Sequence, residues 1–255
     1  MNRQNEDDPV VRPVVSKRAP KGGPVAVMTA TEGDLSTLCP LLGMDRKPPF
    51  PLFMSRLFGR TDMGKGVFLV GPMVGAPYAV MILESLAAMG VRRILFYGWC
   101  GAVSPELAIG DIILPSGAII DEGTSTHYIK HISGEETRSI IPSARPSGSM
   151  NRRLKESLTR NGLAFHEGMI WTTDAIFRET SEKVIRHQKN GVLAVEMELS
   201  ALFTAGSFYG LDVSGLLVVS DEISSLRWIP GFKDDRFKSS RNRICEVISH
   251  LCRIL

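Results

Sequence analysis

APYAVMILESLAAMGVRRILFYGWCGAV, residues 76–103, is the stretch that decides the fold. Pro77 suits the first turn of a helix and Gly90 suits the left-handed residue just past its end, so a helix is predicted up to Gly90. The apolar run 91–98 then predicts a strand, and a similar run lies before the helix at 66–71. A strand, a helix and a strand form a βαβ unit, which predicts neighbouring parallel strands.

Strands and helices alternate along the rest of the chain. Apolar runs predict strands at 24–30, 111–120, 165–173, 192–195 and 212–221. Helical spacing and end signals predict helices at 149–162, 181–191 and 195–210, and over the last 20 or so residues. No linker interrupts this alternation, so residues 25–255 are predicted to form a single α/β domain with a mostly parallel or mixed sheet.

Three short segments depart from this regular pattern. TEGD, residues 31–34, is predicted to be a polar turn, and the proline-rich RKPPFPLF, residues 46–53, is predicted to be irregular. Pro115 kinks its strand and favours a place near a sheet edge. Residues 1–24 are rich in charge, Pro and Gly without periodicity, which predicts a flexible N-terminal arm.

Composition excludes several classes of function. The chain has 255 residues, 44% of them hydrophobic and 22% charged, which is ordinary for a globular protein. A net charge of +3 is too small to indicate nucleic acid as a partner. The four cysteines have no metal-binding spacing, so no metal is expected, and a reducing compartment is indicated. Since no signal peptide or membrane span is recognisable, we expect a cytoplasmic protein without a membrane partner.

Candidate site residues are those that directly follow strands, because ligands of open α/β sheets bind at the carboxyl ends of the strands. Several of these residues are acids, and none is an evident nucleophile; Walker, Rossmann and HExxH motifs are absent. Glu196 and Glu198 suit either the binding of sugar hydroxyls or the positive end of a helix. Asp221 suits either a helix cap or acid/base chemistry. His127 and His166 are isolated, and a structural role is favoured for both.

Five segments, taken in order, carry a family resemblance: GWCGAVSPELAIGDIILP (98–115), DEGTSTHY (121–128), TTDAIF (172–177), AVEMELSAL (194–202) and VVSDE (218–222). The chain resembles the nucleoside phosphorylase family, which includes purine nucleoside phosphorylase, uridine phosphorylase and methylthioadenosine nucleosidase. The resemblance covers roughly residues 24 to 255. It implies a three-layer α/β/α sandwich around a mixed, partly barrel-like sheet, and a homo-oligomer, either a dimer or a hexamer.

The resemblance also implies an activity and a set of site residues. Members of the family cleave or form the bond between ribose and a base. Asp221 matches the aspartate that gives a proton to a leaving purine, which favours a purine nucleoside as substrate. Glu198, Met197 and Glu196 match the ribose-binding segment. Cys100, Gly101, Ile176 and Phe177 fall at the base pocket, where Ile176 stands in place of an aromatic residue.

The segments expected to bind phosphate differ from the family pattern. Gly33 matches the phosphate-binding glycine, but Thr37 and Phe96 stand where arginines are expected, and Trp99 stands where a serine or threonine is expected. The arginine contributed by a neighbouring subunit falls near Phe53. Arg56, Arg60 and Arg178 are therefore the candidate replacement cations. An arginine that assists Asp221 also lacks a match, with Lys233 and Arg236 nearest.

Three functions are compatible with the sequence, and the first is favoured because Arg56, Arg60 and Arg178 could rebuild a phosphate site. The first is phosphorolysis of a purine ribonucleoside to free base and ribose 1-phosphate, with inorganic phosphate as co-substrate and no cofactor. The second is hydrolysis with water as acceptor, which the lost phosphate ligands favour. The third is a nucleoside-binding protein without turnover, against which the retained Glu198, Met197 and Asp221 argue.

Overall fold

The computed structural model describes residues 9–44, 48–62, 65–129 and 142–255. Within them eleven strands form one mixed sheet. The strands are β1 (Val25–Thr29), β2 (Phe50–Leu52), β3 (Ser55–Asp62), β4 (Lys65–Gly71), β5 (Arg93–Ala102), β6 (Ile112–Asp121), β7 (Ser143–Ala144), β8 (His166–Thr173), β9 (Ala194–Glu196), β10 (Asp212–Glu222) and β11 (Ile229–Pro230). The helices are α1 (Glu32–Leu41), α2 (Ala76–Ala88), α3 (Gly148–Arg160), α4 (Ser181–Lys189), α5 (Leu199–Phe208) and α6 (Asp235–Cys252), with short 3₁₀ turns η1 (Thr124–His127) and η3 (Ile176–Arg178).

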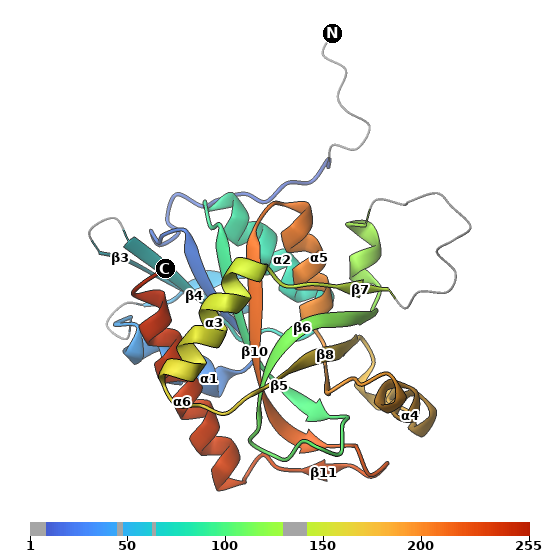
Figure 1. Cartoon of the computed structure of the whole chain (residues 1–255). Helices are drawn as coiled ribbons and strands as arrows, with labels where there is room; N and C mark the ends of the chain where they lie inside the picture. The colour runs from blue at the N-terminus through green and yellow to red at the C-terminus, as the bar shows by residue number, and fades with distance from the viewer. Residues whose placement is uncertain (1–8, 45–47, 63–64, 130–141) are drawn as a thin grey trace.

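The sheet is open at one end and closed at the other. Its order runs β11-β10-β6-β8-β9-β5-β1-β4-β3-β2, and β10 also pairs with β5. Because of this extra pairing, β5, β9, β8, β6 and β10 form a closed ring of five strands. β1, β4, β3 and β2 extend from the ring as an open sheet (Figure 1). The predicted mixed, partly barrel-like sheet is confirmed.

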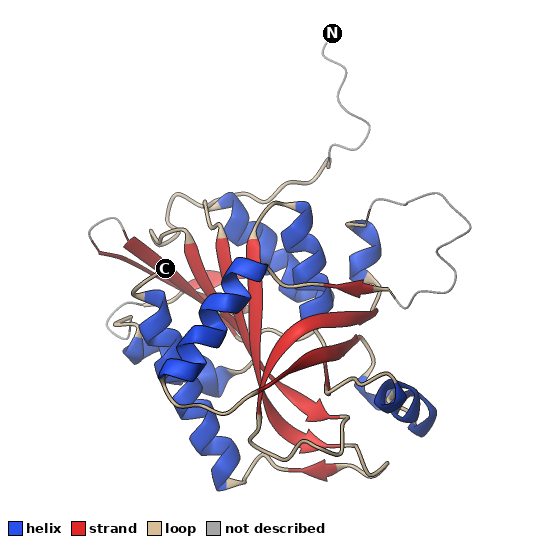
Figure 2. Ribbon diagram, in the orientation of Figure 1, coloured by secondary structure: helices blue, strands red, loops and turns tan. Residues whose placement is uncertain are grey.

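Helices cover both faces of the open part of the sheet, which gives three layers (Figure 2). Side chains alternate along the strands between the two faces. Ala26 and Met28 of β1 share one apolar core with α2 and α5. Val25 and Val27 belong to the other core, together with residues of α1, α3 and α6. A third, smaller core joins Val184 of α4 to the outside of the strand ring.

The two segments predicted to be a turn and an irregular stretch both contain regular structure. TEGD does not form a polar turn: Thr31 caps α1 by accepting a hydrogen bond from the backbone N–H of Asp34, and the other three residues form the first turn of the helix. Residues 50–52 of the proline-rich segment form β2, while residues 46–47 lie outside the described part. β2 ends the strand order, and an edge strand tolerates Pro51 because one side of it needs no ladder partner.

Two further details differ from the prediction. β6 lies between β10 and β8 rather than at an edge, and Pro115 is accommodated by a register shift between Pro115 and Gly117 against β8. The helix predicted from residue 195 begins at Leu199, because the preceding residues complete β9.

The N-terminal segment is described from residue 9 and contains no helix or strand up to residue 24. Its last part packs on the sheet: a Cβ added at Gly23 would lie 2.1 Å from the carbonyl oxygen of Gly66. No described helix is long and apolar enough to cross a membrane.

The core beneath α4 contains an unusual buried histidine. His187 is 2% exposed and stacks on Trp171 with ring centroids 4.3 Å apart. Neither of its ring nitrogens has a hydrogen-bond partner among the described residues. Burial lowers the pKa of His187 from 6.5 to about 4, and the nearby positive charge of Arg186 acts in the same direction.

This burial predicts a loss of stability in mild acid. Below pH 6.5 the unfolded chain binds a proton at His187 that the folded chain does not, so the free energy of unfolding should fall as the pH approaches 4. The expected contribution is roughly 1–2 kcal/mol between pH 7 and pH 5. Urea unfolding at both pH values measures it. His187→Phe should reduce the difference, whereas the exposed-site control His250→Gln should not, and equal pH dependence in all three proteins would contradict the prediction.

Candidate active site

The carboxyl ends of β5, β9 and β10 meet at Gly101. Gly101 pairs with Asp221 of β10 on one side and with Val195 of β9 on the other. A Cβ added at Gly101 would lie 3.3 Å from both Asp221 Oδ2 and a methyl carbon of Val195. The absence of a side chain therefore lets these two strand ends come close together, which the sequence alone did not indicate.

Asp221 is directed by a β-bulge. The register between β10 and β5 shifts between Val219 and Asp221, so that Ser220 is the extra residue. The Ser220 hydroxyl donates to Asp221 Oδ1 at 2.6 Å, and the indole N–H of Trp228 donates to Oδ2 at 2.9 Å. Asp221 is half-buried, and both of its oxygens have a donor.

The cations expected beside Asp221 have other contacts or positions. Arg236 donates to the carboxylate of Asp111 and, at 3.1 Å, to the carbonyl of Ile109. Lys233 is exposed. Instead of a cation, the Trp228 indole donates to Asp221, and the sequence offered no signal for this contact beyond the position of Trp228 seven residues further along the chain.

Glu196 and Glu198 have different surroundings, although both are 5% exposed. Glu196 Oε2 accepts from the backbone N–H groups of Glu198 and Leu199, both at 2.8 Å, and its other oxygen accepts from the Thr172 hydroxyl. Glu196 thus neutralises the amino end of α5, which was one of its two predicted roles. Glu198 Oε1 instead accepts from the backbone N–H of Gly75 at 2.6 Å, across the site.

Burial perturbs both glutamates. It raises the pKa of Glu196, while the hydrogen bonds from Thr172 and the two backbone amides oppose the rise. Burial also raises the pKa of Glu198, and the negative charge of Glu196 adds to the effect. Two neighbouring carboxyl groups with raised pKa values are typical of functional sites. Met197, between them, is half-buried.

The predicted base-pocket residues divide into a buried and an exposed pair. Cys100 is buried beside Gly101, and burial together with the charge of Asp221 raises the pKa of its thiol well above the usual value. Ile176 and Phe177 lie in η3 and are 51% and 96% exposed. Glu179, just after η3, is close enough to Asp221 that burial and this negative charge raise its pKa to about 7.

The predicted phosphate side is filled by four side chains, here called the Asp34 cluster: Thr31, Asp34, Trp99 and Arg241. Asp34 is 1% exposed. Its Oδ2 accepts from the Trp99 indole N–H and the Thr31 hydroxyl, both at 2.7 Å. Its Oδ1 accepts from Arg241 Nε at 2.9 Å and lies 2.7 Å from Arg241 Nη2. The Arg241 guanidinium lies over the Trp99 ring, 4.6 Å from its centroid.

The candidate replacement cations do not gather around Gly33. Arg56 pairs with Glu32, next to Gly33, so one cation reaches this end of α1. Arg60 donates at 2.9 Å to the carbonyl of Leu42, at the opposite end of α1. Arg178 is exposed in η3, which follows β8. A side chain at Gly33 would meet Arg241 Nη2 at 2.9 Å, so Arg241 is the cation that touches this position.

A signal for Arg241 was present in the sequence. Phe237, Ile244 and Ile248 form the buried face of α6. Arg241 follows Phe237 by four residues and precedes Ile244 by three, so it lies on that face. A charged residue on an apolar stripe indicates a buried partner, and here the partner is Asp34.

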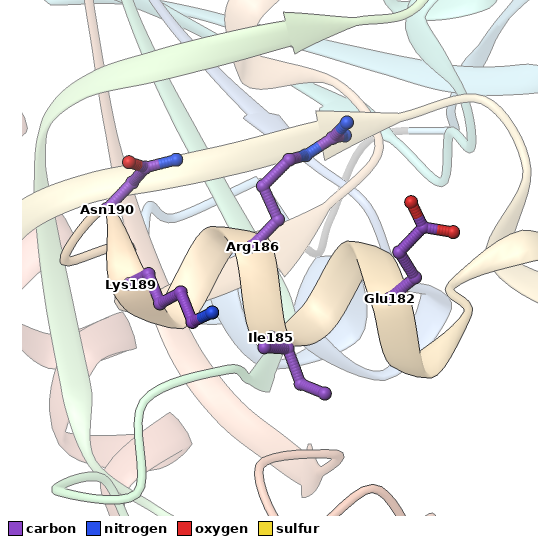
Figure 3. A pocket seen from close by; sticks show the side chains of 5 residues that line it. All are labelled: Glu182, Ile185, Arg186, Lys189 and Asn190. Carbon is purple, nitrogen blue, oxygen red and sulfur yellow. The ribbon is translucent and has the colours of Figure 1, made fainter.

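Hollows among the described residues also lie outside these strand ends. An open hollow of about 610 Å³ lies on the outer side of α4, as Figure 3 shows, and is lined by Glu182, Ile185, Arg186, Lys189 and Asn190. A second, of about 380 Å³, lies between α2, η1 and the end of β8, and His127 and Asp174 line it. The described residues contain no group of three or more side chains suited to a metal ion.

Fold and site together define a class of protein. A three-layer α/β/α sandwich with a partly closed sheet and carboxylates at the strand ends is the architecture of nucleoside phosphorylases. The chain matches the family described as the Phosphorylase superfamily over residues 24–253, and it belongs to that family. The predicted family and the prediction of an enzyme of this type are confirmed.

Individual relatives carry two different names. The chain is 29% identical to the DeoD-type purine nucleoside phosphorylase of Bacillus cytotoxicus over 167 residues, which cover 65% of this chain and 68% of that protein. The protein of the same name in Bacillus cereus is 28% identical over the same shares. The uridine phosphorylase structure from Vibrio fischeri ES114 has a TM-score of 0.75 at 20% identity, covering 93% of this chain and 98% of that one. Its complex with 6-hydroxy-1-naphthoic acid scores 0.73 at 21% identity, covering 92% of each chain.

The contacts of Glu196 predict a structural role for its side chain. Glu196→Ala removes an acceptor from two backbone N–H groups at the start of α5, and it should lower the free energy of unfolding by about 1–2 kcal/mol. Denaturant unfolding measures this loss. The matched control is Glu182→Ala in the exposed first turn of α4, which should change stability by less than about 0.5 kcal/mol. Equal effects of the two substitutions would contradict the assignment.

Proposed function

We propose that this chain cleaves the N-glycosidic bond of a purine nucleoside. The observation that carries the proposal is the junction at Gly101, where Asp221 lies on one side and β9, which leads to Glu198, lies on the other. Cleavage of the N-glycosidic bond needs a carboxylate that binds the sugar and, nearby, a proton donor for the leaving base. The junction supplies both within a single region.

Glu198 serves the sugar in this proposal. A carboxylate accepts strong hydrogen bonds from the vicinal hydroxyls of ribose. The Gly75 amide holds Oε1 at 2.6 Å and so orients the carboxylate. Met197, in the same turn, offers an apolar surface for the sugar ring.

Asp221 serves the base. When the bond breaks, negative charge moves into the base, and a proton delivered to a purine nitrogen lets the base leave neutral. The purine preference is supported by Asp221 and by the name of the Bacillus relatives. The uridine phosphorylase structures support the fold and leave this preference unchanged.

The acceptor of the sugar is either phosphate or water. The relatives named purine nucleoside phosphorylase support phosphate. The Asp34 cluster favours water, because a buried carboxylate already takes the Trp99 N–H and the Arg241 guanidinium that an anion would use. Glu32 in turn pairs with Arg56, so the amino end of α1 holds two acids and two arginines. Since these charges balance, the region offers no excess positive charge for a phosphate dianion, and we take hydrolysis as the better supported reaction.

The surface beside the site supports a homo-oligomer. Phe53, Met54 and Val74 are 58%, 81% and 67% exposed. The Tyr78 hydroxyl accepts from the backbone N–H of Met54 at 3.0 Å, which places this apolar tip at the amino end of α2, close to Gly75. A second copy of the chain would cover these apolar side chains near the sugar side of the site. The family resemblance implies either a dimer or a hexamer.

One assay tests both the reaction and its acceptor. The purified chain is incubated with inosine, adenosine, methylthioadenosine and uridine, with and without inorganic phosphate, and free base is measured by chromatography. We expect purine release that does not require phosphate. Release of base that depends entirely on phosphate would instead show that the reaction is phosphorolysis. Binding without release from any nucleoside would instead identify a non-catalytic nucleoside-binding protein.

A substitution at Asp221 tests the role of the acid. Asp221→Asn keeps the shape of the side chain and removes the transferable proton, so the turnover number for purine release should fall by about 10²–10⁴-fold. Glu196→Gln, which changes a carboxylate assigned to the helix, should lose much less. Near-normal turnover of Asp221→Asn would remove this residue from the mechanism.

A further inference from the structure

Asp221 has a donor on each carboxylate oxygen, and the two donors differ in kind. The Ser220 hydroxyl lies 2.6 Å from Oδ1 and 3.2 Å from the backbone carbonyl of Cys100. It can therefore donate to Oδ1, or it can accept from a protonated Oδ1 and donate to Cys100. The indole N–H of Trp228 lies 2.9 Å from Oδ2 and can only donate.

The position of Trp228 is set by a turn and not by burial. β11 folds back antiparallel on β10, so that Asp221 pairs with Pro230 and Glu222 with Ile229. Leu226, two residues before Trp228, has a φ of 62°, which a leucine adopts only where its surroundings impose it. Trp228 is 63% exposed, so little apolar burial holds the ring in place. Because the chain turns back along β10, the indole N–H of Trp228 comes within hydrogen-bond distance of Asp221.

We propose that Trp228 is a positioning residue for Asp221, holding the carboxyl group in the orientation from which it gives its proton to the leaving base. The role rests on the proposed function, because it concerns the acid of that reaction. The indole N–H of Trp228 can only donate, so Oδ2 is always its acceptor. The Ser220 hydroxyl can donate or accept, so Oδ1 is the oxygen that can carry the transferable proton. The two donors together fix the plane of the carboxyl group.

The donor also differs in charge from the arginine expected beside Asp221. An N–H bonded to a carboxylate stabilises the anion without adding a charge to the site, unlike the arginine expected there. The titratable groups that face Asp221 from neighbouring elements are Cys100 of β5 and Glu179 after η3. Neither group is a cation, so Trp228 takes the place of the expected arginine as a donor to Asp221.

The substitution Trp228→Phe tests this role, because it keeps an aromatic ring and removes the N–H. We expect the turnover number for purine release to fall about tenfold to a hundredfold, since the lost bond is to a charged group, with little change in KM. The control Ile229→Ala lies in the same β11 strand, is also partly exposed, and should keep both the turnover number and the KM of the wild-type protein.

A second measurement does not depend on turnover. The chain has three tryptophans, so ¹⁵N-labelled indole groups give few resonances, and Trp228→Phe identifies one of them. Asp221→Asn should shift the Trp228 resonance, whereas the Trp99 and Trp171 resonances, whose indole groups donate to Asp34 and Asp121, should stay unchanged. Wild-type protein that releases no base from any nucleoside would reject the proposed function alone. A Trp228 resonance insensitive to Asp221→Asn, or a Trp228→Phe variant that changes only KM or nothing, would overturn the positioning role.

Discussion

The parallel pairing of β5 with β10 is the interaction on which the rest of the structure depends. It runs from Arg93 opposite Asp212 to Ala102 opposite Glu222. The first half of β5 also pairs with β1, which connects it to the open sheet. The last residues of β5 pair with β9, and this pairing closes the ring. Because both long strands end at the same edge, their last residues meet. The single register shift at Ser220 then directs Asp221 toward Gly101, where the missing side chain leaves room for it.

The Asp34 cluster is the second constraint, and it acts on the chemistry. Burying an aspartate and an arginine is costly unless their hydrogen bonds are satisfied. Here Thr31, Trp99 and Arg241 supply donors to both oxygens of Asp34, and the guanidinium also lies against the Trp99 ring. A saturated buried ion pair resists replacement by a free anion. The tryptophan in the glycine-rich turn is therefore part of an internal network that occupies the region where phosphate was expected.

The sequence predicted much of this fold because the signals were local. Pro77 and Gly90 marked the ends of α2 correctly, and apolar runs marked the long strands of the sheet. TEGD was assigned to a turn because Thr31 and its neighbours are as common in turns as at helix caps. For the site, the sequence suits Glu196 both to sugar binding and to the amino end of a helix, and in the structure its carboxylate accepts from backbone N–H groups at the start of α5. Trp228 has no neighbour in the sequence that explains its contact with Asp221, whereas Arg241 lies between Phe237 and Ile244 on the apolar face of α6, a pattern that indicates a buried partner without identifying it.

By itself the sequence determined the alternation of strands and helices, which follows from the local spacing of apolar residues and from end signals. The family was indicated by the order of five motif segments that resemble it. Only the tertiary structure decided which side chains meet. Arg241 reaches Asp34 across 207 residues of sequence, and Gly75 reaches Glu198 across 123. Such contacts depend on strand order, ring closure and register, which no local pattern specifies. The chemistry of the site therefore depends on the tertiary structure.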